Sequence, residues 1–417
     1  MAEPFPAGDK TPVVGSRVGT FAALRAPQFR LFWVGGVLFF SAMSMTNLGR
    51  PWLAYEISGS GLNIGIVAVA QGLPMLVLAP FGGVAADRFP KRSIMLVAQA
   101  ILLLTTLTTA ILVLTGVVEI WHLVAISFIH GCVLPFEMTV RNAYLPNLLD
   151  RRLLPNGVAL NSTVHNLNQI VSPSIAGVIL AWDPGTAFIV MTALHGLAVL
   201  TTLRLPLGAP QGGSNKSVLG DLAVGFRYVA GSPTLRMLIF LAFLAMALAH
   251  PYQQLLPTFQ DVLGIGPARL GYLYAAAGMG ALVGSLSVAA FSHLATRGSV
   301  QLLAGVTLGA ALVSFALSPI YLVALGSLFL VGLAQQSYMT INQTALITTS
   351  DPALYGRVMS VVVMIRASAP LAVLPIGALV DAIGAPGAIA SAGAILASTI
   401  VGMRLLWPAP WQRRQTG

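Results

Sequence analysis

Glu137 and Arg141 are two charged residues in an otherwise apolar stretch, and their spacing suggests chemistry. They lie four positions apart, so on a helix they share one face and can form an ion pair. Burial favours the uncharged form of a carboxyl group, so protonation of Glu137 would switch such a pair off. Two interpretations stay open: a proton-coupling site and a fixed structural pair. Glu56 is a second proton-coupling candidate, although it and Arg50 are better interpreted as gate or interface residues.

Arg366 is the most unusual charge in the sequence. It follows an expected helix start near Leu354 by about 18 Å at 1.5 Å per residue, which places it near the middle of an apolar segment. A guanidinium at that depth requires a carboxylate, water or an anionic ligand. We interpret Arg366 as substrate-facing; the alternative is a structural ion pair, for example with Glu137. Pro370 follows and predicts a kink.

Two apolar stretches carry an unusual number of amide and hydroxyl side chains. Such groups face protein or water rather than lipid. Any single one of these side chains could simply form a hydrogen bond between helices. As a set, they indicate a central cavity. The candidate substrate-contacting residues, in addition to Arg366, are His165, Asn166, Asn168, Gln169, Gln335, Gln336 and Asn342.

The remainder of the chain is very poor in charge. Of its 417 residues, 56% are apolar and only 8% are charged, whereas soluble domains carry roughly 25% charged residues. This composition excludes a cytosolic enzyme, and a single cysteine excludes a disulfide scaffold. The sequence holds no phosphate loop, zinc motif or nucleophile elbow, so we expect neither enzymatic activity nor a cofactor.

Long uncharged runs predict where the chain crosses a bilayer. A helix needs ~20 apolar residues to span the hydrocarbon layer. The 53-residue run 298–350 must hold two helices, separated near Ser318 and Pro319, and 358–380 is interrupted only by Arg366. Counted with these, twelve transmembrane helices are predicted, in an all-α membrane protein. The other runs are 31–49, 57–86, 93–118, 120–136, 153–182, 184–203, 237–260, 270–296 and 382–403.

Lysine and arginine collect in alternate loops, which predicts that both termini are cytoplasmic. The net charge of +10 therefore reflects membrane topology, and nucleic acid is not an expected partner. We expect a tail (1–28), a six-helix bundle (29–205), a polar central loop (206–233), a second six-helix bundle (234–406) and a final tail (407–417).

The two halves show a weak parallel repeat. A shift of 206 positions places Pro51 on Pro257 and Gly65 on Gly271, and a shift of 200 places Gly177 on Gly377. Repeats of helix groups are typical of secondary transporters. The 200-position shift also aligns Arg366 with Asn166, which predicts that both face a shared cavity.

The loop after the second expected helix reads Gly83-Val84-Ala85-Ala86-Asp87-Arg88-Phe89-Pro90-Lys91-Arg92. It resembles the signature loop of the major facilitator superfamily, with Pro90 where the family usually has glycine. The resemblance implies that the acid contacts the opposite half and closes the cytoplasmic side. The repeated position in the second half is His293, so that copy is degenerate. The candidate gate residues are Gly83, Asp87, Arg88, Lys91, Arg92 and Arg50.

Residues 141–148 and 156–162 resemble one branch of this superfamily, the enterobactin-exporter and macrolide-efflux-like transporters. Ser172-Pro173-Ser174-Ile175-Ala176-Gly177 is similar to the antiporter motif, with two glycines replaced. The resemblance implies two bundles around a central cavity and proton-driven export of a small amphiphilic or anionic molecule across the inner membrane. The expected partners are that molecule, protons and the bilayer, with the protein a monomer. An importer or facilitator, or a scaffold or sensor that does not transport, stays an alternative.

Overall fold

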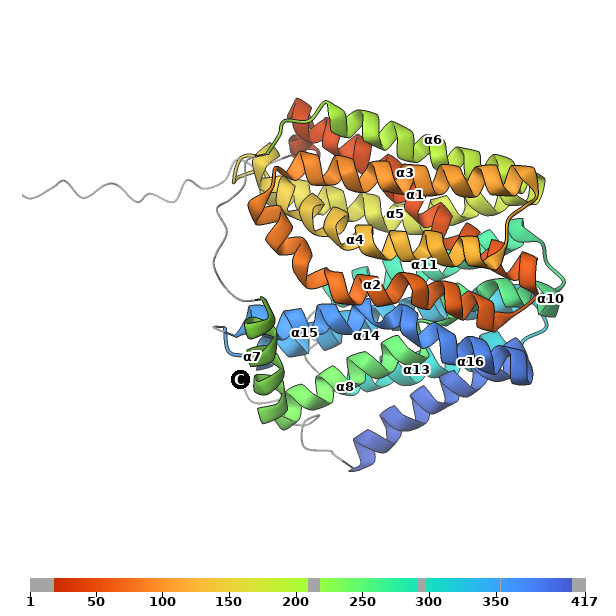
Figure 1. Cartoon of the computed structure of the whole chain (residues 1–417). Coiled ribbons are helices and arrows are strands. Elements are labelled where there is room, and N and C mark those ends of the chain that lie inside the picture. The colour runs from red at the N-terminus through yellow and green to blue at the C-terminus, as the bar shows by residue number, and fades with distance from the viewer. Residues whose placement is uncertain (1–18, 209–217, 292–297, 353, 407–417) are drawn as a thin grey trace, which may run out of the picture.

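The computed structural model describes residues 19–208, 218–291, 298–352 and 354–406, and the regular elements in these ranges are all helices. The N-terminal half contains α1 (Pro27–Ser58), α2 (Gly61–Arg88), α3 (Lys91–Thr115), α4 (Ile120–Leu148), α5 (Leu154–Trp182) and α6 (Pro184–Leu203). The C-terminal half contains α8 (Pro233–Leu248), α9 (Tyr252–Leu255), α10 (Phe259–Leu263), α11 (Pro267–Ala290), α13 (Gly298–Leu317), α14 (Tyr321–Thr349), α15 (Tyr355–Ala367) and α16 (Val373–Leu406). Figure 1 shows the two halves side by side, with the axes of most helices roughly parallel and the chain direction alternating between successive long helices.

Ten of the described helical segments are long and apolar enough to cross a membrane. The 29-residue α5 is not one of them because of the polar side chains noted above. One of the ten, Tyr355–Leu405, is 51 residues long and is broken at Gly384, whose φ of 80° interrupts the helix. With α5 included and this segment counted as two crossings, the structure agrees approximately with twelve predicted spans. The protein is a multi-pass membrane protein.

Local sequence signals set several helix ends. Gly59 adopts a positive φ of 61° after α1, and Ser60 caps α2 by accepting a hydrogen bond from the backbone N–H of Asn63. Asp183 caps α6 in the same way through Thr186, and these hydrogen bonds lower the pKa of its carboxyl group. The predicted break in the 298–350 run lies between Leu317 and Tyr321.

Part of the central connection is helical, although its polar composition predicts a loop. Residues 218–231 form α7 (Val218–Gly231), which packs against α15 and α8 at one end of the molecule (Figure 1). Leu222 and Val229 are buried in this packing, and the Tyr228 hydroxyl accepts a hydrogen bond from the backbone N–H of Asp351 at 3.1 Å. Apolar residues at helical spacing, missed in the sequence, explain why a helix forms here.

Two large helix–helix contacts between the halves are related by the sequence repeat. α5 packs against α11, and α2 packs against α16. In both contacts glycines bring the backbones together: a Cβ on Gly177 would lie 3.0 Å from Cα of Gly271, and one on Gly377 would collide with the carbonyl oxygen of Gly61. Small residues at helix crossings are typical of packing in membranes, where close approach supplies the van der Waals contact.

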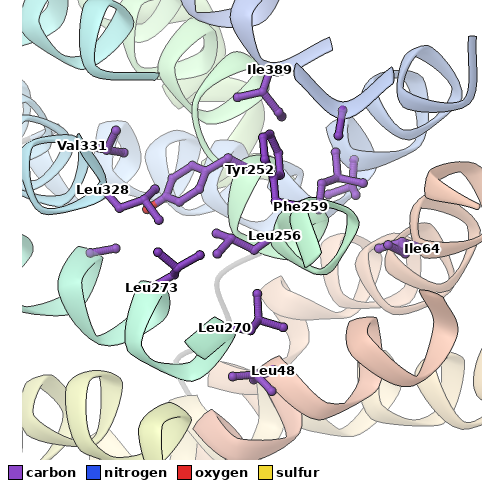
Figure 2. Close-up of a cluster of buried hydrophobic side chains, with 14 of the residues drawn as sticks. Leu48, Ile64, Tyr252, Leu256, Phe259, Leu270, Leu273, Leu328, Val331 and Ile389 are labelled. Carbon is purple, nitrogen blue, oxygen red and sulfur yellow. The ribbon is translucent and has the colours of Figure 1, made fainter. Parts of the chain in front are cut away.

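A continuous apolar core runs across this boundary. Figure 2 shows Leu48 of α1 and Ile64 of α2 in one cluster with Leu256, Phe259 and Leu270 of the other half. All five side chains are at most 1% exposed. The halves are thus joined near the end of the molecule that carries Ser58 and Gly61.

Candidate substrate and gating sites

The predicted pair of Glu137 and Arg141 is present, deep inside the N-terminal half. Arg141 Nη1 donates to Glu137 Oε1 at 3.2 Å, and the side chains of Arg141 and Glu137 are 2% and 0% exposed. Gln99 of α3 donates to the same carboxylate oxygen at 2.8 Å, while Arg141 Nη2 donates to the backbone oxygen of Phe32 at 3.3 Å. Glu137 Oε2 and Arg141 Nε make no hydrogen bond. The carboxylate therefore balances a guanidinium that water does not reach.

Aromatic rings surround the Arg141 guanidinium. Its Cζ atom lies 4.7 Å from the ring centroid of Phe32 and 5.4 Å from those of Phe39 and Phe40. These distances are within cation–π range, so α1 contributes to holding the charge. The pair thus contacts α1 and α3.

Arg366 lies at the end of α15 and is exposed. Its Nη2 atom donates to Gln343 Oε1 of α14 at 3.0 Å, and it lines a pocket with Met246 and Met339. The ion pair with Glu137 that was the alternative is not formed. A short 3₁₀ segment, Ala369–Ala372, follows α15 and accounts for the kink predicted at Pro370.

The polar residues of α5 divide into two groups. Asn168 is buried and serves packing, because its Oδ1 accepts from Ser41 at 2.6 Å and from Ser172 at 2.8 Å. Asn166 and Gln169 are exposed, and Gln169 is bonded to His165 Nε2 at 2.8 Å. The second group thus lies at the surface of the protein.

The polar residues of α14 divide similarly. Asn342 is 2% exposed and donates to the backbone oxygen of Leu238 at 3.1 Å, which ties α14 to α8. Gln335 is half-buried and Gln336 is exposed. Gln343, one residue after Asn342, was not singled out in the sequence. No sequence pattern marks Gln343. Only its hydrogen bond with Arg366, seen in the structure, distinguishes it from the other polar residues of α14.

Arg50, predicted as a gate residue, lies inside the N-terminal half. It is 7% exposed, and its guanidinium donates to Gln71 Oε1 at 2.9 Å and to His130 Nδ1 at 3.0 Å. Glu56, one and a half turns further along α1, is exposed. The two residues do not pair, as their six-residue spacing predicts.

The signature loop lies at the end of the molecule opposite Ser58. Lys91 is buried, and its backbone N–H donates to the carbonyl oxygen of Gly208 at 3.3 Å. Gly83, Asp87 and Arg92 are half-buried and Arg88 is exposed. Within the part of the chain that the structure describes, the Asp87 carboxylate makes no hydrogen bond or ion pair. The repeated position, His293, lies outside the described residues.

At the other end, Asp381 of α16 holds the first turn of α2 in the opposite half. Its Oδ1 accepts from the backbone N–H of Gly61 at 2.6 Å, and its Oδ2 accepts from Ser60 Oγ at 2.5 Å and the N–H of Leu62 at 3.1 Å. A carboxylate at a helix N-terminus satisfies free N–H groups and the positive end of the helix dipole. No sequence signal singled out Asp381, because a single sequence does not show which acidic residue near a helix end contacts the other half.

Two further hydrogen bonds join the halves at this end. Tyr55 donates to Asp261 Oδ2 at 2.5 Å, and Trp52 Nε1 donates to Gln260 Oε1 at 3.2 Å. The 206-position shift aligns Tyr55 with Asp261. Equivalent positions of two repeated halves contact each other only near the symmetry axis between the halves, so this hydrogen bond lies close to that axis. We call the set Trp52, Tyr55, residues 60–62, Gln260, Asp261 and Asp381 the latch.

The family model described as transmembrane secretion effector matches residues 18–413, nearly the whole chain. The chain belongs to this family, within the major facilitator superfamily. It is a membrane transporter of major facilitator type and not an enzyme, as the sequence predicted.

Two exporters resemble the chain over most of its length. The multidrug efflux pump Tap of Mycolicibacterium fortuitum is 29% identical over 351 residues, which cover 82% of this chain and 86% of Tap. The enterobactin exporter EntS of Shigella boydii serotype 18 is 26% identical over 339 residues, 80% of each chain. Among solved structures, the nucleoside transporter NupG has a TM-score of 0.74 at 14% identity, over 92% of this chain and 99% of NupG. That likeness supports the major facilitator fold.

Proposed function

We propose that the protein exports a small amphiphilic or anionic molecule by alternating access, driven by a proton gradient. The observation that carries the proposal is the unequal closure of the two ends: the latch joins the halves at one end, while among the described residues Asp87 is unengaged at the other. The distribution of Lys and Arg favours a protein in the inner membrane with both termini in the cytoplasm. In that orientation the latch lies on the outer side and is the outer gate. The signature loop is then the inner gate, and the conformation is closed to the outside.

Export rather than import is favoured by the relatives, since Tap is named an efflux pump and EntS an exporter. The exposed Arg366 suits a substrate with negative charge or strong hydrogen-bond acceptors, because its only side-chain partner among the described residues is the neutral Gln343. His165, Asn166, Gln169, Gln335 and Gln336 supply further polar contacts in this proposal.

Proton coupling is assigned to Glu137, the carboxylate that lies well inside a span. A proton on Glu137 would leave Arg141 without a counterion in a site with almost no water, so protonation would favour a different arrangement of α1, α3 and α4 around the pair. This is how one proton would be linked to a change between the two gate states.

Efflux of a panel of fluorescent drugs and aromatic acids from cells tests the proposal. We expect at least one compound to be exported by the wild type, with efflux abolished by an uncoupler and reduced by about tenfold or more in Arg366→Ala, since the substrate loses its only cationic contact in that pocket. Arg269→Ala is the matched control, because that guanidinium lies at the latch end, 5.6 Å from the ring centroid of Tyr321. Efflux that persists with the uncoupler would contradict proton coupling, and full activity of Arg366→Ala would remove that residue from the substrate site.

A further inference from the structure

Arg50 is a buried cation without a counterion among the described residues. It lies eight residues before the end of α1, about 12 Å along the helix, and is 7% exposed. Both of its hydrogen-bond partners, Gln71 and His130, are side chains without negative charge. No carboxylate of the described residues pairs with it. A buried guanidinium is costly unless an anion balances it.

His130 does not supply that balance, and its hydrogen bonds define its tautomer. Its Nδ1 accepts from Arg50, so the ring proton lies on Nε2, which faces Thr105 Oγ1 at 2.8 Å. The Thr105 hydroxyl donates its own hydrogen to the backbone oxygen of Leu102 at 2.9 Å, which leaves its oxygen free to accept from His130. A neutral His130 satisfies all of these hydrogen bonds. The positive charge of Arg50 is therefore not balanced by its hydrogen-bond partners.

A pocket lies beside this charge. Phe39, Met43, Leu102 and Leu134 form its apolar wall, and no acidic residue lines it. Asn47, on the same helix as Arg50, is exposed and also lines the pocket, which therefore reaches the surface of the half. The pocket is too small in this conformation to enclose a whole organic molecule, so the charge and the apolar wall match a negatively charged group together with the adjoining part of a hydrocarbon body.

Resting on the transport function proposed above, we propose that Arg50, Gln71 and His130 form an anion-binding site that takes the carboxylate of an organic acid. Arg50 has five N–H donors and uses two of them, and the side-chain amide N–H groups of Gln71 make no hydrogen bond among the described residues. These donors are available to a carboxylate, which accepts two parallel bonds from a guanidinium. His130 holds the guanidinium in place from the other side.

The test is a comparison of two probes of nearly equal shape, 1-naphthoate and the uncharged 1-naphthamide. Their binding to the purified full chain in detergent is measured by titration calorimetry. We expect the wild type to bind 1-naphthoate more tightly than 1-naphthamide by about tenfold or more, because only the naphthoate supplies the missing counterion. Arg50→Gln removes the charge and is expected to abolish this preference.

A second variant covers the case in which Arg50→Gln does not fold. Gln71→Glu places a carboxylate against the guanidinium, so the site has an internal counterion and the naphthoate preference is expected to disappear while the fold is kept. Arg30→Gln and Gln28→Glu make the same chemical changes at exposed positions near the start of α1 and are expected to keep the preference.

Equal binding of the two probes by the wild type, or an unchanged preference in Gln71→Glu, would overturn the anion site. Binding in detergent requires neither transport nor a proton gradient, so the two proposals fail separately. Uncoupler-sensitive export without any naphthoate preference would leave the proposed function and remove the site. A preference for naphthoate without any export would keep the anion site and remove the proposed function.

Discussion

Glu137→Ala is expected to destabilise the protein by about 3–5 kcal/mol, since it leaves the 2%-exposed Arg141 guanidinium without its counterion. The bond from Gln99 to Glu137 is lost as well, so a second buried polar group is left without its partner. The measurement is the free energy of unfolding in detergent micelles, from denaturant titration followed by far-UV circular dichroism. Glu56→Ala, an exposed glutamate on α1, is the matched control and is expected to change stability by less than about 0.5 kcal/mol.

The double variant Glu137→Leu/Arg141→Met separates an unpaired charge from lost packing. Replacing both charges by apolar groups of similar volume is often neutral for stability, so the double variant is expected to recover most of what Glu137→Ala loses. A double variant as unstable as Glu137→Ala would show that shape, and not charge balance, dominates this site.

Asp381→Ala is expected to shift the protein towards a state open at the latch end. The carboxylate bridges α16 to the first turn of α2 through three hydrogen bonds, so its loss weakens only the arrangement in which the halves meet there. Loss of a helix N-terminal capping group costs roughly 0.5–2 kcal/mol, which corresponds to about a two- to thirtyfold shift in population.

Spin labels at Trp121 and Ile320 measure this shift. Both residues are exposed, at 61% and 57%, and they lie at the starts of α4 and α14 in opposite halves. The sole cysteine, Cys132, is first replaced by alanine. We expect a longer inter-label distance to gain population in Asp381→Ala. Asp183→Ala, which removes a cap within one half, is expected to leave the distribution unchanged. An unchanged distribution in Asp381→Ala would mean that the Trp52 and Tyr55 hydrogen bonds and the apolar core of Figure 2 hold this end closed without Asp381.

Much of the fold could be predicted from the sequence because the bilayer imposes simple rules. Uncharged runs of about 20 residues predicted the spans, and the break near Ser318 was found between Leu317 and Tyr321. The repeat relates helices of the first half to helices of the second, and the structure shows a corresponding pair of contacts, α5 with α11 and α2 with α16. Helix α7 was missed because a stretch of sequence rich in Gly, Ser and Pro precedes it and because, at 14 residues, it is too short to span a membrane.

The site was less predictable, since contacts between distant helices leave little trace in one chain. The pair of Glu137 and Arg141 was found because both residues lie on one helix, four apart. Arg50 was interpreted as a gate residue because it lies near an expected helix end. In the structure α1 continues to Ser58 and Arg50 is buried within the bundle, which the sequence alone did not show. Asp381 and Gln343 lie 320 and 23 positions from their partners Gly61 and Arg366, and only the fold brings them together.

Proton-coupled export is most directly tested in proteoliposomes. Liposomes are loaded with the compound that cells export and with pyranine, a pH-sensitive dye, and are then diluted into substrate-free buffer that is more acidic than their interior. The account predicts that the pH gradient accelerates efflux, that pyranine reports proton entry only when substrate is inside, and that Glu137→Gln loses both effects. An efflux rate independent of the gradient, with no proton entry, would contradict it.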